Sequence, residues 1–262
     1  MLSSRQRRRL GQSVRRVVAC LLVAAIALVA SKDSFSDSLL PASLQRAESV
    51  LWVIAHPDDE SFFFAPAILN LLQDSRKGAV LCLSSGDHDG LGSQRRRELK
   101  ASCAVLGIDS DRCDVLDIPE LADDPKAWWP AAAIEQQVES RVRTWGVDVI
   151  FTFDDYGVSG HANHRAVASA LTRRAALPPV FAVRSTSVLT KFTSILLLPL
   201  VLLRRLVARS AVPEKAVFVN SWRQYTTTLE SFGAHKSQAT WFRTLFIYFS
   251  RYLWYVDAIR VS

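Results

Sequence analysis

The sequence lacks the cysteine spacings that mark structural zinc sites and disulfide frameworks. It has four cysteines in 262 residues, and no two of them form a C-x-x-C pair. Three of them stand in apolar surroundings, so we expect buried, reduced thiols rather than disulfides. The four are Cys20, Cys82, Cys103 and Cys113. The chain also contains no N-x-S/T sequon, which disfavours a heavily glycosylated lumenal domain.

No apolar run reaches the roughly 20 residues that a membrane-spanning helix usually needs. Val17–Ala30 has fourteen apolar residues behind the basic segment 1–16. Its length fits a secretory signal peptide, and Ala25-Ile26-Ala27 resembles a cleavage site. A signal-anchor that tilts or thins the bilayer is the alternative. Residues 31–47 have the composition of a linker, and we expect one folded domain over residues 48–262.

Net positive charge is small outside the N-terminus. The formal net charge is +7, and without the six arginines of residues 1–16 it is +1. These six are Arg5, Arg7, Arg8, Arg9, Arg15 and Arg16. A nearly neutral domain does not have the electrostatic footprint of a nucleic-acid binder, so we expect no nucleic-acid partner.

The most informative stretch of the chain is an apolar run followed at once by ionisable residues. Val50–Ala55 is typical of a strand buried on both faces, and H-P-D-D-E follows at residues 56–60. In open α/β sheets the carboxyl ends of the strands line the ligand crevice. Four ionisable side chains there favour a divalent metal held by His56 and one carboxylate, with a neighbouring carboxylate as base. A solvated turn is the alternative.

Strands and helices alternate through the following hundred residues. Further apolar runs predict strands, and amphipathic segments between them predict helices. The predicted strands are Ala79–Ser84, Cys113–Ile118 and Val147–Phe153, and the predicted helices are Ala65–Leu72, Ser93–Leu106, Ala131–Trp145 and Arg165–Leu177. This order indicates an α/β fold with a Rossmann-like, mostly parallel sheet covered by helices on both faces, preceded by an N-terminal membrane segment.

A second polar loop follows the last of these strands. Residues 154–164 read D-D-Y-G-V-S-G-H-A-N-H, and they precede a predicted helix. Parallel strands place this loop at the same edge of the sheet as residues 56–60. His161 and His164, three residues apart, can point into one cavity if the first helical turn includes them. Two histidines at a second strand end strengthen the prediction of a metal site.

Two later segments have the composition of membrane-surface elements. Ile195–Leu203 is an uninterrupted run of apolar residues and proline among basic residues, and it fits either an interfacial or re-entrant helix or a core helix kinked at Pro199. Trp241–Val256 combines aromatic rings with arginines, as is favoured at the level of lipid headgroups. We expect it to be a helix that docks on the bilayer with Trp254 and Tyr255 exposed. A core-packing helix is the alternative.

Two motifs resemble those of the PIG-L/LmbE-like metal-dependent deacetylases. They are A-H-P-D-D-E at residues 55–60 and G-V-S-G-H-A-N-H at residues 157–164. The resemblance extends from about Val50 to Tyr252. The tail of the chain, residues 235–252, is most similar to the membrane-bound members of the family.

The resemblance implies a role for each motif residue. His56, Asp59 and His164 would hold a zinc ion, or another divalent metal, and Asp58 would be the general base. His161 would stabilise the oxyanion or protonate the leaving amine. Independently, three protein ligands leave one metal position open for water, whose pKa the metal lowers to about 7.

Other positions carry weaker implications. Arg95 matches a family arginine near the substrate and would contact an inositol phosphate. Many bacterial relatives carry Asp where this chain has Asn163, so we expect Asp154 or Asp155 to supply the charge that supports His161. His235 matches a late family histidine whose role stays open between a functional one and a structural tie.

The resemblance also implies a substrate and a location. The membrane-bound members hydrolyse the N-acetyl group of N-acetylglucosaminyl-phosphatidylinositol, an early step in the synthesis of glycosylphosphatidylinositol (GPI) anchors. They work at the endoplasmic reticulum membrane with a cytosolic catalytic domain, in contact with membrane lipid. The N-terminal arginines would instead send the domain to the lumen by the positive-inside rule. A soluble-type deacetylase of another N-acetylglucosaminyl compound and a non-catalytic membrane scaffold are the alternatives.

Overall fold

A seven-stranded mixed sheet forms the centre of the protein in the computed structural model, which describes residues 4–172, 176–207, 214–239 and 241–262. The strand order is β3-β2-β1-β4-β5-β7-β6. All neighbouring pairs are parallel except those of β7, which runs antiparallel to β5 and β6. The strands are β1 (Ser49–Ile54), β2 (Lys77–Cys82), β3 (Cys113–Val115), β4 (Val149–Phe153), β5 (Val180–Val183), β6 (Lys215–Val219) and β7 (Tyr255–Arg260). The predicted α/β fold with a mostly parallel sheet is confirmed.

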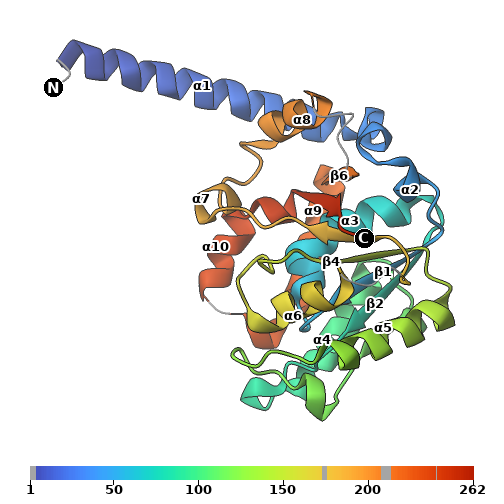
Figure 1. Cartoon of the computed structure of the whole chain (residues 1–262). Coiled ribbons are helices and arrows are strands. Elements are labelled where there is room, and N and C mark those ends of the chain that lie inside the picture. Colours follow the sequence, from blue (N-terminus) through green and yellow to red (C-terminus); the bar gives the residue numbers. More distant parts are fainter. Residues whose placement is uncertain (1–3, 173–175, 208–213, 240) are drawn as a thin grey trace.

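Helices cover both faces of this sheet (Figure 1). On one face α5 (Ala131–Trp145) and α6 (Ala162–Leu171) pack together and contact β1. On the other face α9 (Trp222–Ala234) contacts α3 (Ala65–Leu71) and α4 (Gly92–Val105). The bounds of α5 agree with the prediction. The predicted helix Arg165–Leu177 instead begins three residues earlier and ends at Leu171, and residues 173–175 lie outside the described part of the chain.

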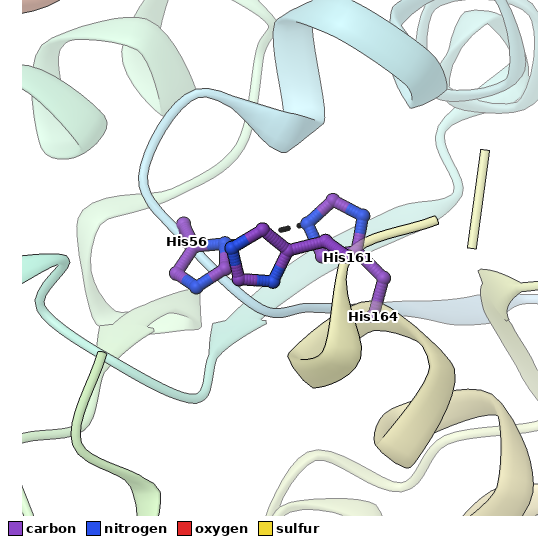
Figure 2. Close-up of side chains that lie close together, drawn as sticks. All are labelled: His56, His161 and His164. Carbon is purple, nitrogen blue, oxygen red and sulfur yellow. Dashed lines mark hydrogen bonds between the residues drawn. The ribbon is translucent and has the colours of Figure 1, made fainter. Parts of the chain in front are cut away.

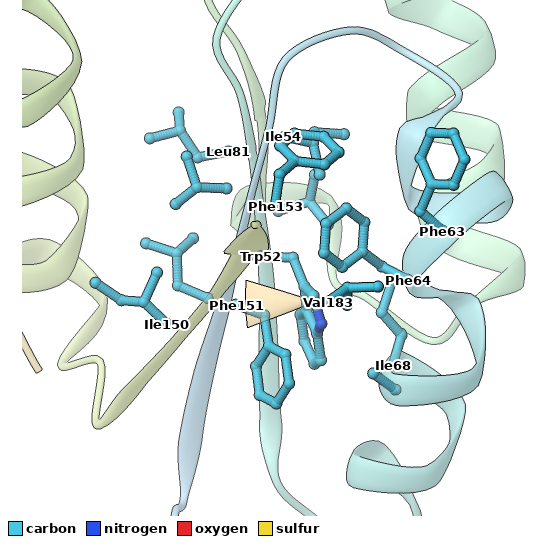
Figure 3. Packing of buried hydrophobic residues seen from close by; sticks show 14 of the residues in the cluster. Trp52, Ile54, Phe63, Phe64, Ile68, Leu81, Ile150, Phe151, Phe153 and Val183 are labelled. Carbon is cyan, nitrogen blue, oxygen red and sulfur yellow. The ribbon is translucent and has the colours of Figure 1, made fainter. Parts of the chain in front are cut away.

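Aromatic rings of neighbouring strands stack across the sheet. The ring of Phe151 on β4 stacks on Trp52 of β1, with centroids 5.9 Å apart, and on Phe181 of β5 at 5.5 Å. Figure 3 shows Phe64 and Ile68 beside one face of the strands, with Ile150 on the opposite side. Because the strands are apolar on both faces, they are buried in the middle of the molecule, and polar chemistry is confined to their ends.

The N-terminal helix is longer than the apolar run predicts. Helix α1 (Ser4–Ala30) joins the basic start and the apolar segment in 27 residues, about 40 Å at 1.5 Å per residue. Arginine is a good helix former, so the basic segment continues the helix. Among the described residues, α1 is the one helix long and apolar enough to cross a membrane. It projects away from the domain (Figure 1), with Ala25 and Val29 buried near its end.

Residues 31–47 are tied to the domain more closely than a linker would be. They form the short helical turns η1 (Lys32–Ser34), η2 (Ser36–Leu39) and α2 (Ala42–Gln45). Leu39 and Leu44 are buried in the apolar clusters of the domain. The apolar side chains in this polar stretch explain why it packs against the sheet.

The two segments with membrane-surface composition differ from the prediction in their extent. Helix α8 is Leu198–Val207, so Pro199 lies in its first turn and does not kink it. The expected helix over Trp241–Val256 is wrong beyond residue 249. Helix α10 (Trp241–Phe249) ends there, and the turn η9 (Arg251–Leu253) and strand β7 follow.

The expected exposure of Trp254 and Tyr255 is also wrong, because both side chains are buried. Trp254 stacks on Tyr225 with ring centroids 3.8 Å apart, and Tyr255 begins the buried strand β7. A buried inner strand and an amphipathic helix both need apolar residues, so composition alone did not distinguish them.

The prediction of reduced thiols is wrong for two of the four cysteines. Cys103 near the end of α4 and Cys113 at the start of β3 form a disulfide, with Cα atoms 6.5 Å apart. The short connection between α4 and β3 brings the two together. Cys82 is a free buried thiol, as expected, and Cys20 is free and exposed on α1.

Candidate metal centre and active site

Two loops meet at the carboxyl ends of β1 and β4, which are neighbours in the sheet. Strand β1 has β2 on one side and β4 on the other. The chain adds β2 and β3 on the first side and then crosses to β4 on the second, so the strand order reverses between β1 and β4. Ligand sites of open α/β sheets form at such points. Residues 56–60 follow β1 and residues 154–164 follow β4, and Figure 2 shows that His56, His161 and His164 point toward one another. Ligand atoms of these three histidines lie within 4.8 Å of one another.

Asp59 joins two of these histidines. His164 Nε2 lies 3.3 Å from His56 Nδ1 and 3.3 Å from Asp59 Oδ1. His56 Nδ1 lies 4.0 Å from Asp59 Oδ2. Ligand atoms that are about 2.0–2.1 Å from a tetrahedral zinc ion lie about 3.3 Å apart. The two separations at His164 match this value, and the separation of 4.0 Å between His56 and Asp59 is longer.

The hydrogen bonds on the far sides of the rings determine which nitrogens face this point. His164 Nδ1 lies 2.9 Å from the carbonyl oxygen of Gly157, so Nδ1 carries the proton and donates a hydrogen bond to that oxygen. His56 Nε2 lies 3.1 Å from Asn163 Oδ1 and 3.2 Å from Asp123 Oδ1, both of them acceptors. The remaining lone pairs, on His164 Nε2 and His56 Nδ1, converge with the Asp59 carboxylate. Three converging acceptors fit a cation, and two nitrogens with one oxygen fit zinc.

Because the three side chains are buried, their close approach is energetically unfavourable without a cation. Burial raises the pKa of Asp59 to about 7, with Asp58 and Glu60 adding to the rise and His56 opposing it. Burial also holds the pKa of His164 well below its usual value, and the charge of His56 lowers it further. A bound cation would keep the carboxylate ionised and the imidazole neutral, which are the states in which both groups act as ligands.

His161 differs from the other two histidines in burial and in hydrogen bonding. It is the N-cap of α6, and its Nδ1 accepts a hydrogen bond from the backbone N–H of Asn163 at 3.3 Å. Its pKa is lowered by partial burial and by the charge of His56, while Asp123, Asp124 and Asp58 oppose this. Since Nδ1 is an acceptor, the neutral ring carries its proton on Nε2, which can donate to a substrate.

The expectation that Asp154 or Asp155 supplies the charge beside His161 is wrong, because Asp123 and Asp124 of the β3–α5 connection do so. Asp154 has a different supporting role. It accepts hydrogen bonds from the backbone N–H of Gly157 at 3.1 Å and of Ser185 at 2.6 Å, and so holds the loop whose carbonyl orients His164. Asp155 is exposed, and its backbone carbonyl accepts from Arg165.

Glycine is required at position 157 for two reasons. Its φ of +69° lies in the left-handed region, which side chains disfavour. A Cβ atom there would also lie 2.7 Å from the Cβ of His164. The close approach allows the Gly157 carbonyl to reach the imidazole.

Asp58 has a strained backbone conformation, with a φ of +127°. Its backbone N–H donates to Glu60 Oε2 at 3.0 Å, which stabilises the turn. Its carboxylate oxygen Oδ2 accepts a hydrogen bond from Arg243 Nη2 at 2.5 Å and lies 3.6 Å from Arg95 Nη2. The backbone and two arginines therefore hold the Asp58 carboxylate in one orientation beside the candidate metal ligands.

The expected contact of Arg95 with a substrate phosphate stays a prediction, and within the chain Arg95 contacts other groups. Arg95 is buried, and it donates to the carbonyl oxygens of Gly86 and Pro57, both at 2.9 Å. Its guanidinium also lies 3.6 Å from Asp58 and 3.7 Å from Asp123. These contacts make Arg95 a positioning residue that joins the loops after β1, β2 and β3.

His235 has a structural role, because it pairs with a buried carboxylate. Its Nε2 contacts Glu60 Oε1 at 2.5 Å, and both side chains are fully buried. Ser102 also donates to Glu60 Oε1, at 2.5 Å. Burial lowers the pKa of His235, but the Glu60 carboxylate outweighs burial and raises it. The pair connects α9 to the turn that carries Asp58.

Two residues of the site were not singled out from the sequence. Asp123 contacts His56, and it lies beyond the carboxyl end of β3, so the strand-end rule that found His56 could have found it. Arg243 on α10 gives no local signal of its role. It pairs with Asp58, and its guanidinium lies 4.6 Å from the centre of the Phe62 ring.

Known proteins are similar to this chain in sequence and in fold. The family model described as "PIG-L: GlcNAc-PI de-N-acetylase" matches residues 51–175. The chain is 34% identical to the probable N-acetylglucosaminyl-phosphatidylinositol de-N-acetylase of Schizosaccharomyces pombe, over 89% of this chain and 94% of that protein. It is 36% identical to the N-acetylglucosaminyl-phosphatidylinositol de-N-acetylase of Bos taurus, over 78% of this chain and 79% of that protein.

Solved structures support the fold at lower sequence identity. The N,N'-diacetylchitobiose deacetylase of Pyrococcus horikoshii superposes with a TM-score of 0.57 at 15% identity, over 82% of this chain and 84% of that one. The zinc-inhibited form of the teicoplanin deacetylase Orf2 has a TM-score of 0.57 at 12% identity, over 82% of this chain and 98% of that one.

Proposed function

The chain belongs to the PIG-L family of deacetylases, and we propose that it hydrolyses the N-acetyl group of N-acetylglucosaminyl-phosphatidylinositol. The products are glucosaminyl-phosphatidylinositol and acetate, and the reaction is an early step of GPI-anchor synthesis. The convergence of His56 Nδ1, His164 Nε2 and Asp59 Oδ1 on one point is the observation that carries the chemistry.

In this proposal His56, Asp59 and His164 hold zinc or another divalent cation. When bound, such a cation polarises a carbonyl oxygen and lowers the pKa of a water molecule. Asp58 accepts the proton of the attacking water. Arg243 and Arg95 keep the Asp58 carboxylate oriented for this transfer.

His161 acts on the acetamide oxygen. Because its Nδ1 accepts from the backbone N–H of Asn163, its Nε2–H is available to donate to the oxygen on which negative charge develops. The leaving amine takes up the proton that Asp58 has accepted from water. Of the two roles expected for His161, stabilising the oxyanion and protonating the leaving amine, we therefore propose the first.

A membrane setting accounts for the exposed apolar residues. Helix α1 is exposed along most of its length and would anchor the domain in the bilayer. Exposed apolar side chains also lie on α10, at Leu245, Tyr248 and Phe249, and on α7 (Val188–Lys191). We propose that these helices lie against the membrane surface, so that the lipid chains of the substrate stay in the bilayer.

The proposed location is the endoplasmic reticulum membrane, with the domain on the cytosolic side. The missing sequons support this side, whereas the Cys103–Cys113 disulfide removes the support that reduced thiols would have supplied. Protease treatment of sealed microsomes that carry the full chain with a C-terminal tag tests the orientation. Digestion of the tag supports the cytosolic side, and a protected tag places the domain in the lumen.

Acetate release from two substrates tests the function. Full-length protein in detergent is incubated with N-acetylglucosaminyl-phosphatidylinositol and with its lipid-free headgroup, N-acetylglucosaminyl-inositol phosphate. We expect release from both, with faster turnover of the lipid, and loss of activity after treatment with a chelator. Release from the headgroup alone would favour a soluble-type deacetylase, and release from neither would contradict the proposal.

A further inference from the structure

A second cavity, of about 500 Å³, lies between α8 and the sheet edge formed by β6 and β7. Its volume is in the range of small-ligand sites. Five basic side chains and one acidic side chain line it: Arg184, Arg204, Arg205, Lys215, Arg251 and Asp257. None of them belongs to the metal centre described above.

The one carboxylate neutralises only part of this charge. Asp257 pairs with Arg184, at 3.2 Å, and with Arg251, at 2.5 Å. Within the described part of the chain, Arg204, Arg205 and Lys215 pair with no carboxylate. The lining has a formal charge of +4, which favours an anionic ligand.

Buried polar atoms of the lining also have no partner. Arg251 is 2% exposed, and its Nε makes no hydrogen bond within the described residues. The Nε of Arg205 is likewise buried without a partner there. Since such groups are normally hydrogen-bonded, a ligand that accepts hydrogen bonds would complete this cavity.

The wall of the cavity on the α8 side has apolar residues beside its two arginines, Arg204 and Arg205. Leu197, Leu200 and Val201 contribute to it. Helix α8 also packs against the end of α1, where Leu198 and Leu202 form a cluster with Ala25 and Val29 (Figure 1). The cavity is therefore beside the helix that we propose to be in the membrane, and both cationic and apolar side chains line it.

We propose that this cavity binds the phosphate of an anionic phospholipid, with the start of its acyl chains along α8. The unpaired arginines accept the phosphate and headgroup charge through charge-assisted hydrogen bonds. Leu197 and Leu200 contact the hydrocarbon that a free phosphate ion does not have. None of the charged lining residues belongs to the metal centre, so binding at this cavity can be tested without measuring activity.

The test uses the full chain in neutral detergent micelles and fluorescent phosphatidylserine, with fluorescent phosphatidylcholine for comparison. We expect preferential binding of phosphatidylserine. The double variant Arg204→Gln/Arg205→Gln should bind it about 30-fold more weakly, since each basic residue near an anionic lipid contributes a several-fold gain. The control Arg97→Gln/Arg223→Gln removes the same charge from exposed positions on α4 and α9 and should stay within about twofold of the unchanged protein.

Two further measurements distinguish the lipid from a free anion and from misfolding. Leu200→Gln should weaken the binding of phosphatidylserine, while its melting temperature stays unchanged because the side chain is 41% exposed. Water-soluble glycerophosphoserine and inorganic phosphate should displace the lipid only at far higher concentrations. Equal binding by the two double variants, no preference over phosphatidylcholine, or efficient displacement by inorganic phosphate would overturn the proposal.

Discussion

His56 Nδ1 and His164 Nε2 lie 3.3 Å apart although 108 positions separate them in the chain. The opposite nitrogen of each ring is held by an acceptor, Asn163 or Asp123 for His56 and the Gly157 carbonyl for His164. Two imidazole nitrogens that face each other beside a buried carboxylate need a proton or a metal cation between them, and the carboxylate favours either. This relationship is the basis of the first two predictions.

Replacing His164 by Ala should remove stoichiometric metal and activity together, because two remaining ligands cannot hold a tetrahedral zinc site. Metal content of the purified protein and acetate release measure the two effects. His88→Ala, on an exposed loop, is the matched control and should keep its metal. Full metal occupancy in the His164 variant would exclude this residue from the ligand set.

Replacing Asp123 by Asn should weaken metal affinity by about 10- to 100-fold, since the residue orients a ligand without being one. Competition with a chromophoric chelator measures the affinity. Asp124→Asn changes the exposed neighbouring carboxylate and should leave the affinity unchanged. An unchanged affinity in both variants would show that Asn163 alone is sufficient to orient His56.

Replacing Asp58 by Asn should leave the metal bound and lower kcat by about 100- to 10,000-fold, because an amide does not accept the proton of water. Asp155→Asn, at an exposed position, is the control. A near-native kcat would assign the base role to another group. Glu60 is a poor replacement, since it is fully buried and bonded to His235 and Ser102.

The Glu60–His235 pair should make stability depend on pH. The pKa of His235 is raised from 6.5, since the Glu60 carboxylate outweighs burial, and that of Glu60 is lowered from 4.5, since His235 outweighs burial. The contribution of His235 is therefore complete below pH 6.5 and is lost as the pH rises through its raised pKa. The contribution of Glu60 is present above pH 4.5 and is lost as the pH falls through its lowered pKa.

His235→Gln should accordingly destabilise the protein most between these limits, by about 3–5 kcal/mol, as expected for a broken buried pair. Denaturant unfolding at several pH values measures the difference between the two proteins. It should shrink above pH 6.5. A difference that stays constant from pH 5 to pH 9 would show that the pair is not charged.

Replacing Leu245 and Tyr248 by Ser should reduce recovery of the protein with vesicles and slow turnover of the lipid substrate, but spare the lipid-free headgroup. Both side chains are exposed on α10, at 47% and 66%. Trp254→Ala is the contrasting variant. It removes a buried ring and should lower stability by about 3–5 kcal/mol with equal effects on both substrates. Equal loss on both substrates in the α10 variant would argue against a membrane contact.

The sequence by itself determined the elements that depend on local patterns. The apolar run before residue 56 specified β1, because only a strand buried on both faces tolerates such a run between polar segments. The polar residues after β1 and β4 indicated His56 with one neighbouring carboxylate, and His161 and His164, because parallel strands bring their carboxyl ends to one edge. Family resemblance then supplied the chemistry.

The tertiary structure alone decided the contacts between distant segments. Arg243 meets Asp58 across 185 positions, and Cys103 meets Cys113 through the packing of α4 on β3. The end of the chain forms β7 rather than a longer helix because the gap between β5 and β6 accepts a strand there. Local periodicity contains no information on which neighbour completes a sheet or neutralises a buried charge, since both depend on what the rest of the chain brings to that place.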